Sequence, residues 1–129
     1  MTQDPIADAL SSIRNAEQSG LGECEIQPAS NLLGNILDVM REAGYIGSYE
    51  TVEDHRSGSY RVELNGNVNE CGVIRPRFSV PTDDLEQWES RYLPGRDFGK
   101  LILTTTEGVV DHNEAKDLGV GGKLLAFVY

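Results

Sequence analysis

The sequence predicts an α+β fold with two small subdomains: an N-terminal α-β-α-β-β unit over residues 1–79 and a C-terminal, mostly antiparallel β subdomain with short helices over residues 80–129. Two segments in the first half repeat apolar residues at helical spacing, and short runs rich in β-branched and aromatic residues recur between turn residues. The composition becomes polar after Val80. A chain of 129 residues suits one domain or two small subdomains.

The first and third elements are predicted helices. Asp4 can cap a helix that has Pro5 in its first turn, and apolar residues then recur at three- and four-residue spacing. A short strand over residues 24–26 leads to a second helix, which Ser30 or Asn31 can cap and Gly44 ends. Its apolar positions are dense enough to be core.

Strands and turns follow in the middle of the chain. Residues 45–52 and 60–64 have strand character, and residues 55–58 between them predict a hairpin turn. Residues 73–80 form a further extended stretch. The order helix, strand, helix, strand, strand indicates a compact α+β unit.

The C-terminal third alternates short helices and strands. A polar helix is predicted over residues 81–91, and a strand over residues 100–105. A glycine turn then leads to a short helix over residues 112–117, which ends near Leu118 and whose start has the spacing of a capping box. Glycines end this helix, and residues 124–129 form a final apolar strand.

The charge balance is strongly acidic. The formal net charge is −10, from 21 acidic and 11 basic residues, and only three of the basic residues are lysines. Taken alone, this balance opposes binding to nucleic acid. In 1 M salt, however, the Debye length falls to about 3 Å, so an acidic surface no longer repels phosphate over distance. Two interpretations stay open: a protein adapted to concentrated salt, or an ordinary acidic protein.

The sequence begins without the basic and apolar segments of a signal peptide, and no apolar run approaches the roughly 20 residues of a membrane span. We therefore expect a cytoplasmic protein with no membrane partner. Cys24 and Cys71 lack the paired spacing of a metal site. A disulfide and a metal pair stay open, but a reducing compartment favours two small buried hydrophobes.

Catalysis and metal binding find little support, so no catalytic residue, metal ligand or cofactor is predicted. The candidate bases are His55, in a predicted turn, and His112, at the start of a short helix; neither lies in a motif, and we expect both at the surface. A small hydrolase using residues 104–106 with His112 is disfavoured because no carboxylate–histidine pairing is visible. The glycines of residues 119–122 follow a helix, whereas a phosphate-cradling loop precedes one.

The strongest local feature is the sequence Thr104-Thr105-Thr106-Glu107-Gly108. On composition alone it is a strand that ends in a turn, because threonine favours strands and glycine favours turns. A second interpretation is a row of short hydroxyls, which can hydrogen-bond base edges, 2′-hydroxyls and phosphates. Hydroxyls do this without net positive charge, which matters in an acidic protein.

Three stretches resemble, in order, the signature of the small-subunit ribosomal protein S-eight family. They are DPIADALSSIRNA (4–16), GKLILTTTEGVVDHNEAK (99–116) and GVGGKLLAFVY (119–129). The segment RYLP (91–94), followed by Phe98 and Gly99, resembles the archaeal branch of the family. With the acidic composition, a halophilic archaeon is the expected source.

The resemblance implies a structural protein of the small ribosomal subunit that binds the central domain of 16S rRNA directly and supports its assembly. The implied target is a helix with an irregular internal loop, contacted at its minor groove. Neighbouring small-subunit proteins and the mRNA of its own operon are further implied partners. The implied RNA-binding residues are Thr104, Thr105, Thr106, Glu107, Gly108, Gly121, Gly122 and Lys123, with Arg14 and Asn15 making a secondary backbone contact.

An alternative hypothesis is a protein-interaction module of an acidic assembly, without direct RNA binding. The polar helix around residues 83–92 could present Trp88 and Tyr92 as anchors for a partner. The same two side chains could instead pack into the core of their own subdomain. Binding to protein with no affinity for RNA would favour the interaction module.

Overall fold

The computed structural model describes residues 4–27, 29–53, 58–95 and 98–129. The elements along the chain are α1 (Pro5–Gln18), β1 (Glu23–Ile26), α2 (Asn31–Glu42), β2 (Tyr49–Val52), β3 (Ser59–Glu63), β4 (Cys71–Val73), β5 (Ser79–Val80), the 3-10 turn η1 (Thr82–Asp84), α3 (Leu85–Tyr92), β6 (Lys100–Thr105), β7 (Gly108–Asp111), α4 (His112–Leu118) and β8 (Gly122–Val128). The predicted α+β class and the predicted order of the first five elements are confirmed.

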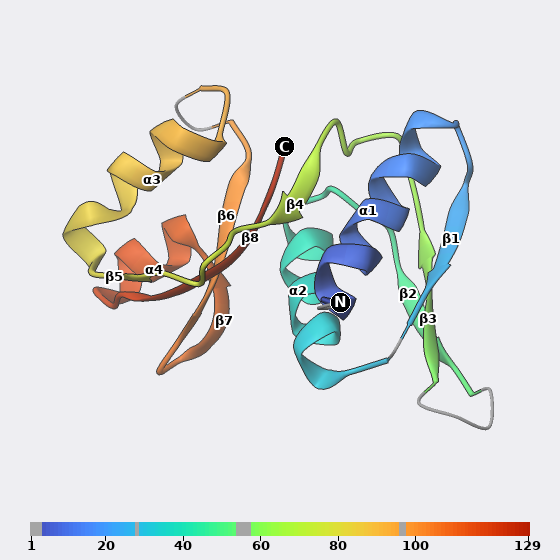
Figure 1. Ribbon diagram of the computed structural model, residues 1–129, viewed down its shortest axis with the longest axis horizontal. Coiled ribbons are helices and arrows are strands. Elements are labelled where there is room, and N and C mark those ends of the chain that lie inside the picture. Colours follow the sequence, from blue (N-terminus) through green and yellow to red (C-terminus); the bar gives the residue numbers. More distant parts are fainter. Residues whose placement is uncertain (1–3, 28, 54–57, 96–97) are drawn as a thin grey trace.

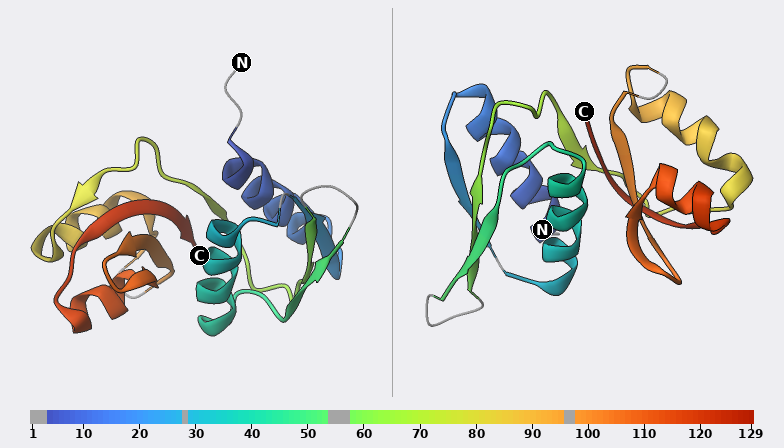
Figure 2. Two further views of the ribbon diagram at one scale, coloured as in Figure 1. Left: turned by 90° about the horizontal axis from the view of Figure 1, so that it is seen from below. Right: turned by 180° about the vertical axis from the view of Figure 1, so that it is seen from behind.

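The strands form two antiparallel sheets. The first has the order β1-β3-β2, and the second has the order β4-β8-β6-β7 with β5 also paired to β8. Helices α1 and α2 lie between the sheets, and α3 and α4 lie on the far side of the second sheet (Figure 1). The views of Figure 2 show the same arrangement. Helix α1 contacts both β1 and β4, and α2 contacts β7, so the central helices join the two sheets.

Two apolar clusters follow from this layering. The first contains the buried faces of α1 and α2 together with Ile102 and Ala126 from the second sheet. The second contains Leu101, Leu103 and Leu124 from the same strands, packed with residues of α3 and α4. Strands β6 and β8 are therefore buried on both faces, which explains why their sequences are continuous apolar runs.

Helix caps come from the residues that the sequence singles out. Asp4 accepts hydrogen bonds from the backbone N–H groups of Ile6 and Ala7, and Ser30 accepts one from Leu33. Asp111 caps α4 in the same way, and Gly119 ends that helix with a left-handed φ of 70°. Each cap satisfies backbone groups that a helix end leaves unpaired.

Several predicted bounds are wrong. The strand expected over residues 45–52 begins only at Tyr49. The stretch 73–80 is split into β4 and β5, because Pro76 has no N–H for a strand ladder and the carbonyl of Pro76 accepts a tight-turn bond from Phe78. Most of the predicted hairpin turn 55–58 lies outside the described residues. The proposed boundary between residues 1–79 and 80–129 stays a prediction.

Candidate RNA-binding surface

The threonine-rich segment forms the hairpin turn between β6 and β7. Thr105 pairs with Gly108, so Thr106 and Glu107 form the two-residue connection at its tip. Thr106, Glu107 and Gly108 are exposed, and Thr104 is half-buried. Gly108 has a φ of 107°, a conformation that favours glycine. The hairpin therefore presents its tip to solvent from the end of a doubly buried strand.

The hydroxyl of Thr105 holds the turn together. It donates to the carbonyl of Gly108 at 2.8 Å and accepts from the backbone N–H of Glu107 at 3.0 Å. The hydroxyls of Thr104 and Thr106 make no hydrogen bond to any other residue that the structure describes. The three threonines thus divide into one that shapes the turn and two whose hydroxyls are free for a ligand.

Three segments of the chain, one of them this turn, meet at an open hollow. The hollow has a volume of about 540 Å³, which lies within the roughly 300–1,000 Å³ of typical ligand sites. Its lining residues are Ser79, Val80, Pro81, Thr104, Thr105, Thr106, Gly121, Gly122 and Lys123. The first three were missed by the sequence analysis, because nothing local in residues 79–81 shows that β5 will lie alongside β8.

Gly121 and Gly122 allow the backbones around the hollow to approach closely. A Cβ atom on Gly122 would lie 2.1 Å from the carbonyl oxygen of Thr104, and one on Gly121 would lie 2.4 Å from that of Val80. Neither backbone position has room for a side chain. These glycines therefore shape the floor of the hollow. The fold requires them at these positions even if they do not contact a ligand.

Lys123 lies between two hydroxyl residues on one face of the second sheet. Its cross-strand partners are Ser79 on β5 and Thr104 on β6. Directly opposite residues in a sheet point their side chains to the same face. An ammonium group flanked by two hydroxyls results, and Lys123 and Ser79 are both exposed.

The basic residues are distributed unevenly between ion pairs and free positions. Every described cation up to residue 75 is paired: Arg14 with Glu70, Arg41 with Asp38, Arg61 with Glu50 and Arg75 with Asp4, at 3.1–3.4 Å. Among the described cations after residue 75, only Lys116 is paired, with Glu89. The described cations without a carboxylate partner are Arg77, Arg91, Lys100 and Lys123. Positive charge available to an anion is thus concentrated in the C-terminal half of the described chain.

The remaining predicted site residues, Arg14 and Asn15, lie apart from the hollow. Both belong to α1, and neither lines the hollow. Asn15 is exposed, whereas the guanidinium of Arg14 is held 3.3 Å from the carboxylate of Glu70. The structure therefore brings together the predicted residues of the C-terminal half. Arg14 and Asn15 lie on α1, away from the hollow.

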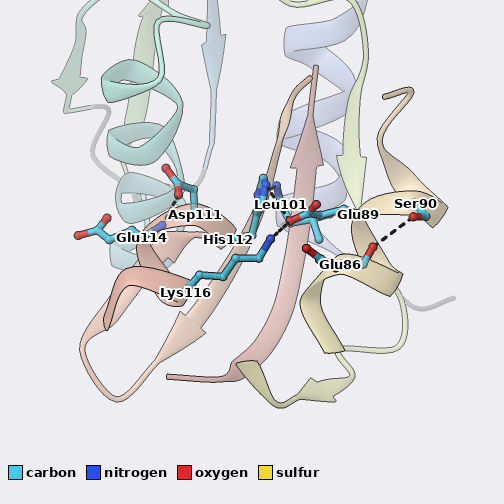
Figure 3. A network of polar contacts seen from close by, with 8 residues as sticks. All are labelled: Glu86, Glu89, Ser90, Leu101, Asp111, His112, Glu114 and Lys116. Atoms are coloured by element: carbon cyan, nitrogen blue, oxygen red, sulfur yellow. Dashed lines mark hydrogen bonds and ion pairs between the residues drawn. The ribbon is translucent and has the colours of Figure 1, made fainter. Parts of the chain in front are cut away.

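A buried polar network beneath α3 corrects two expectations. His112 is only 2% exposed, not a surface residue, and its Nε2 lies 3.2 Å from Glu89, so a carboxylate–histidine pair exists. Its Nδ1 accepts the backbone N–H of Leu101 at 3.0 Å, while Lys116 donates to the same carboxylate (Figure 3). Both imidazole nitrogens are occupied, and the free threonine hydroxyls lie at the other end of β6. We therefore assign the His112–Glu89 pair to the packing of the core. The other candidate base, His55, lies outside the described residues.

The two cysteines are free thiols, Cys71 buried and Cys24 half-buried. Burial raises the pKa of Cys24 to about 11 and that of Cys71 to about 12, and the Cys71 thiol contacts the carbonyl of Leu10 at 3.3 Å. The described residues contain no group of three or more His, Cys, Asp or Glu side chains that could hold a metal. No helix in the described ranges is both long enough and apolar enough to cross a membrane.

Comparison with known proteins agrees with the resemblance along the whole chain. The family model described as Ribosomal protein S8 matches residues 4–129. Proteins named "Small ribosomal subunit protein uS8" are similar throughout: that of Methanococcoides burtonii is 55% identical over 126 residues, 98% of this chain and 97% of the relative. Those of Haloquadratum walsbyi and Picrophilus torridus are 51% and 52% identical, covering at least 97% of both chains. All three relatives are archaeal. The chain belongs to the Ribosomal protein S8 family.

Proposed function

We propose that this chain binds ribosomal RNA through the 104–108 turn and the adjoining 121–123 segment. The observation that carries the proposal is the hollow in which free threonine hydroxyls, closely approaching glycine backbones and an unpaired lysine converge. As a family member, the chain is a structural, non-enzymatic constituent of the small ribosomal subunit, located with the ribosomes of the cytoplasm.

The chemistry of the hollow suits distorted RNA better than a regular duplex. A-form RNA hides its major-groove base edges, so proteins contact 2′-hydroxyls and the bases that irregular loops expose. Threonine hydroxyls both donate and accept, and so match 2′-hydroxyls and base edges alike. The turn is held rigid by Thr105, which lowers the entropy that must be lost on binding.

Within the ribosomal RNA, the proposed binding site is a helix with an irregular internal loop in the central domain of 16S rRNA. The mRNA of the protein's own operon would bind by presenting the same loop shape. Glu107 and Gly108 would lie at the RNA because they form the exposed part of the turn. Asn15, and Arg14 after release from Glu70, would make the secondary backbone contact from α1.

The test replaces hydroxyls that the fold does not use. Thr104→Val and Thr106→Val keep the side-chain shape and each remove one free hydroxyl. Each should weaken binding to a 16S rRNA central-domain fragment by about 1 kcal/mol, or roughly fivefold in Kd. Thr51→Val is the matched control, because Thr51 is exposed on β2 of the other sheet. Unchanged affinity for both hollow variants, in molar KCl, would refute the site.

We also propose that the source is a halophilic archaeon. The supporting observation is a net charge of −10 with only three lysines, since repulsion among so many carboxylates is tolerable when salt screens it. A free energy of unfolding that is independent of KCl concentration would count against this origin.

A further inference from the structure

A continuous row of aromatic side chains runs along the α3 side of the second sheet. Successive ring centroids lie 4.6–6.4 Å apart, within or close to the range of interacting aromatic pairs. The row includes the only tryptophan and all three phenylalanines of the chain. In order of contact, this aromatic strip consists of Phe78, Trp88, Tyr92, Phe127, Tyr129 and Phe98.

The strip is not closed off by the fold. Phe98 is 51% exposed, and the other five rings are half-buried against the second apolar cluster. Trp88 and Tyr92 are nearly parallel, with 9° between their planes. Trp88 and Tyr92 therefore pack against the core, which was one of the two alternatives that the sequence left open. Part of each ring still lies at the surface, where a ligand can reach it.

Two free arginines accompany one end of the strip, one in contact with a ring and one adjacent to a ring in the sequence. Arg91 lies with its Cζ 4.8 Å from the centroid of the Trp88 ring, and Arg77 immediately precedes Phe78. Neither arginine has a carboxylate partner among the described residues. In the other subdomain, Arg41 also lies over an aromatic ring, that of Tyr49, but there Asp38 neutralises it. The arginine over Trp88 thus keeps its positive charge, whereas the arginine over Tyr49 is neutralised.

We infer that the aromatic strip is a second RNA contact, which stacks unpaired bases while Arg77 and Arg91 contact their phosphates. Aromatic rings and guanidinium planes are the groups on which proteins stack splayed-out bases. Free cations beside the rings favour a polyanion over a neutral or basic protein segment. This inference rests on the proposed function, because it supposes that the chain already holds RNA.

The strip also adjoins the hollow through the backbone. Ser79 lines the hollow, while its neighbour Phe78 begins the strip, and successive residues of an extended chain point to opposite faces. Arg77 is exposed just before both. An RNA strand leaving the hollow would therefore pass around the β5 edge and reach Phe78 and Trp88.

The sole tryptophan makes the inference directly testable by fluorescence. A single-stranded oligoadenylate of six nucleotides should quench Trp88 emission in the full chain at 1 M KCl, because stacking depends less on salt than phosphate pairing does. Arg91→Gln and Arg77→Gln should each raise the Kd about fivefold. Arg41→Gln, at the neutralised arginine–aromatic pair, is the matched control and should change nothing.

The two RNA contacts can be separated by the same titration. The double variant Thr104→Val/Thr106→Val should bind the rRNA fragment more weakly but keep its Kd for oligoadenylate, whereas Arg91→Gln should raise the Kd for oligoadenylate about fivefold. Absence of quenching by oligoadenylate, or equal Kd values for Arg91→Gln and the unaltered chain, would overturn the inference. Tighter binding of an acidic peptide than of oligoadenylate would also overturn it, since it would make the strip a protein-docking surface.

Discussion

The imidazole Nε2 of His112 lies 3.2 Å from the carboxylate of Glu89, and this pair links the start of α4 to the middle of α3. Because Nδ1 accepts the N–H of Leu101, the proton of the neutral ring is on Nε2, the nitrogen that lies next to the carboxylate. One side chain thereby connects two helices to β6. Burial lowers the pKa of His112, and the charge of Glu89 only partly offsets that effect.

The lowered pKa of His112 predicts that acid weakens the fold. The ordinary pKa is 6.5, so as pH falls below that value the unfolded chain takes up this proton before the folded chain does. The unfolded state then binds more protons, and the free energy of unfolding decreases. Urea unfolding at pH 7.5 and pH 5.5 should show this loss. The decrease in the free energy of unfolding between pH 7.5 and pH 5.5 should be smaller in His112→Gln. An equal decrease in both proteins would contradict the role given to His112.

Glu89→Gln tests the electrostatic half of the same pair. The amide oxygen can still accept from His112, but the negative charge that raises the histidine pKa is gone. The pKa of His112 should therefore fall further, as measured by NMR titration of its ring protons. An unchanged pKa would mean that the carboxylate does not interact with the ring.

Gly122→Ala should be severely destabilising. Its Cβ would lie 2.1 Å from the carbonyl oxygen of Thr104, a backbone atom that cannot move without separating β6 from β8. We expect a loss of about 3 kcal/mol or more in the free energy of unfolding. Gly22→Ala is the control, because nothing lies within 4 Å of its Cβ, and its effect should stay within about 0.5 kcal/mol.

Thr105→Val should act on stability as well as on RNA. The valine cannot donate to Gly108 or accept from Glu107, so the turn loses both side-chain bonds. We expect a loss of about 1–2 kcal/mol in thermal or urea unfolding. Thr106→Val, whose hydroxyl has no partner among the described residues, should leave unfolding unchanged. Equal stability of the two variants would show that the turn bonds contribute nothing.

The free energy of unfolding should rise with KCl concentration. At a net charge of −10 the folded chain repels itself, and raising the salt from 0.1 M to 1 M shortens the Debye length from about 10 Å to about 3 Å. Urea unfolding at both salt concentrations measures the gain. Equal free energies of unfolding at the two salt concentrations would contradict the prediction.

Local order in this protein was readable from the sequence. Asp4, Ser30 and Asp111 cap the helices where their spacing predicts, because a cap involves only residues two or three positions away. The candidate site residues of the C-terminal half were predicted from the threonine row and from the family resemblance. The split of residues 73–80 was missed, since it depends on which strand lies alongside.

The sequence by itself determined the α+β class, the caps and the turn that carries Thr106, all of which follow from short-range periodicity and backbone preference. Only the tertiary structure decided that Ser79, Thr104 and Lys123 share one row, that His112 is buried against Glu89, and that six distant rings form one strip. Several of these relationships join residues far apart in the sequence, such as Ser79 with Lys123 and Glu89 with His112. Pairing partners across such distances are chosen by packing of the whole chain, which no local pattern encodes.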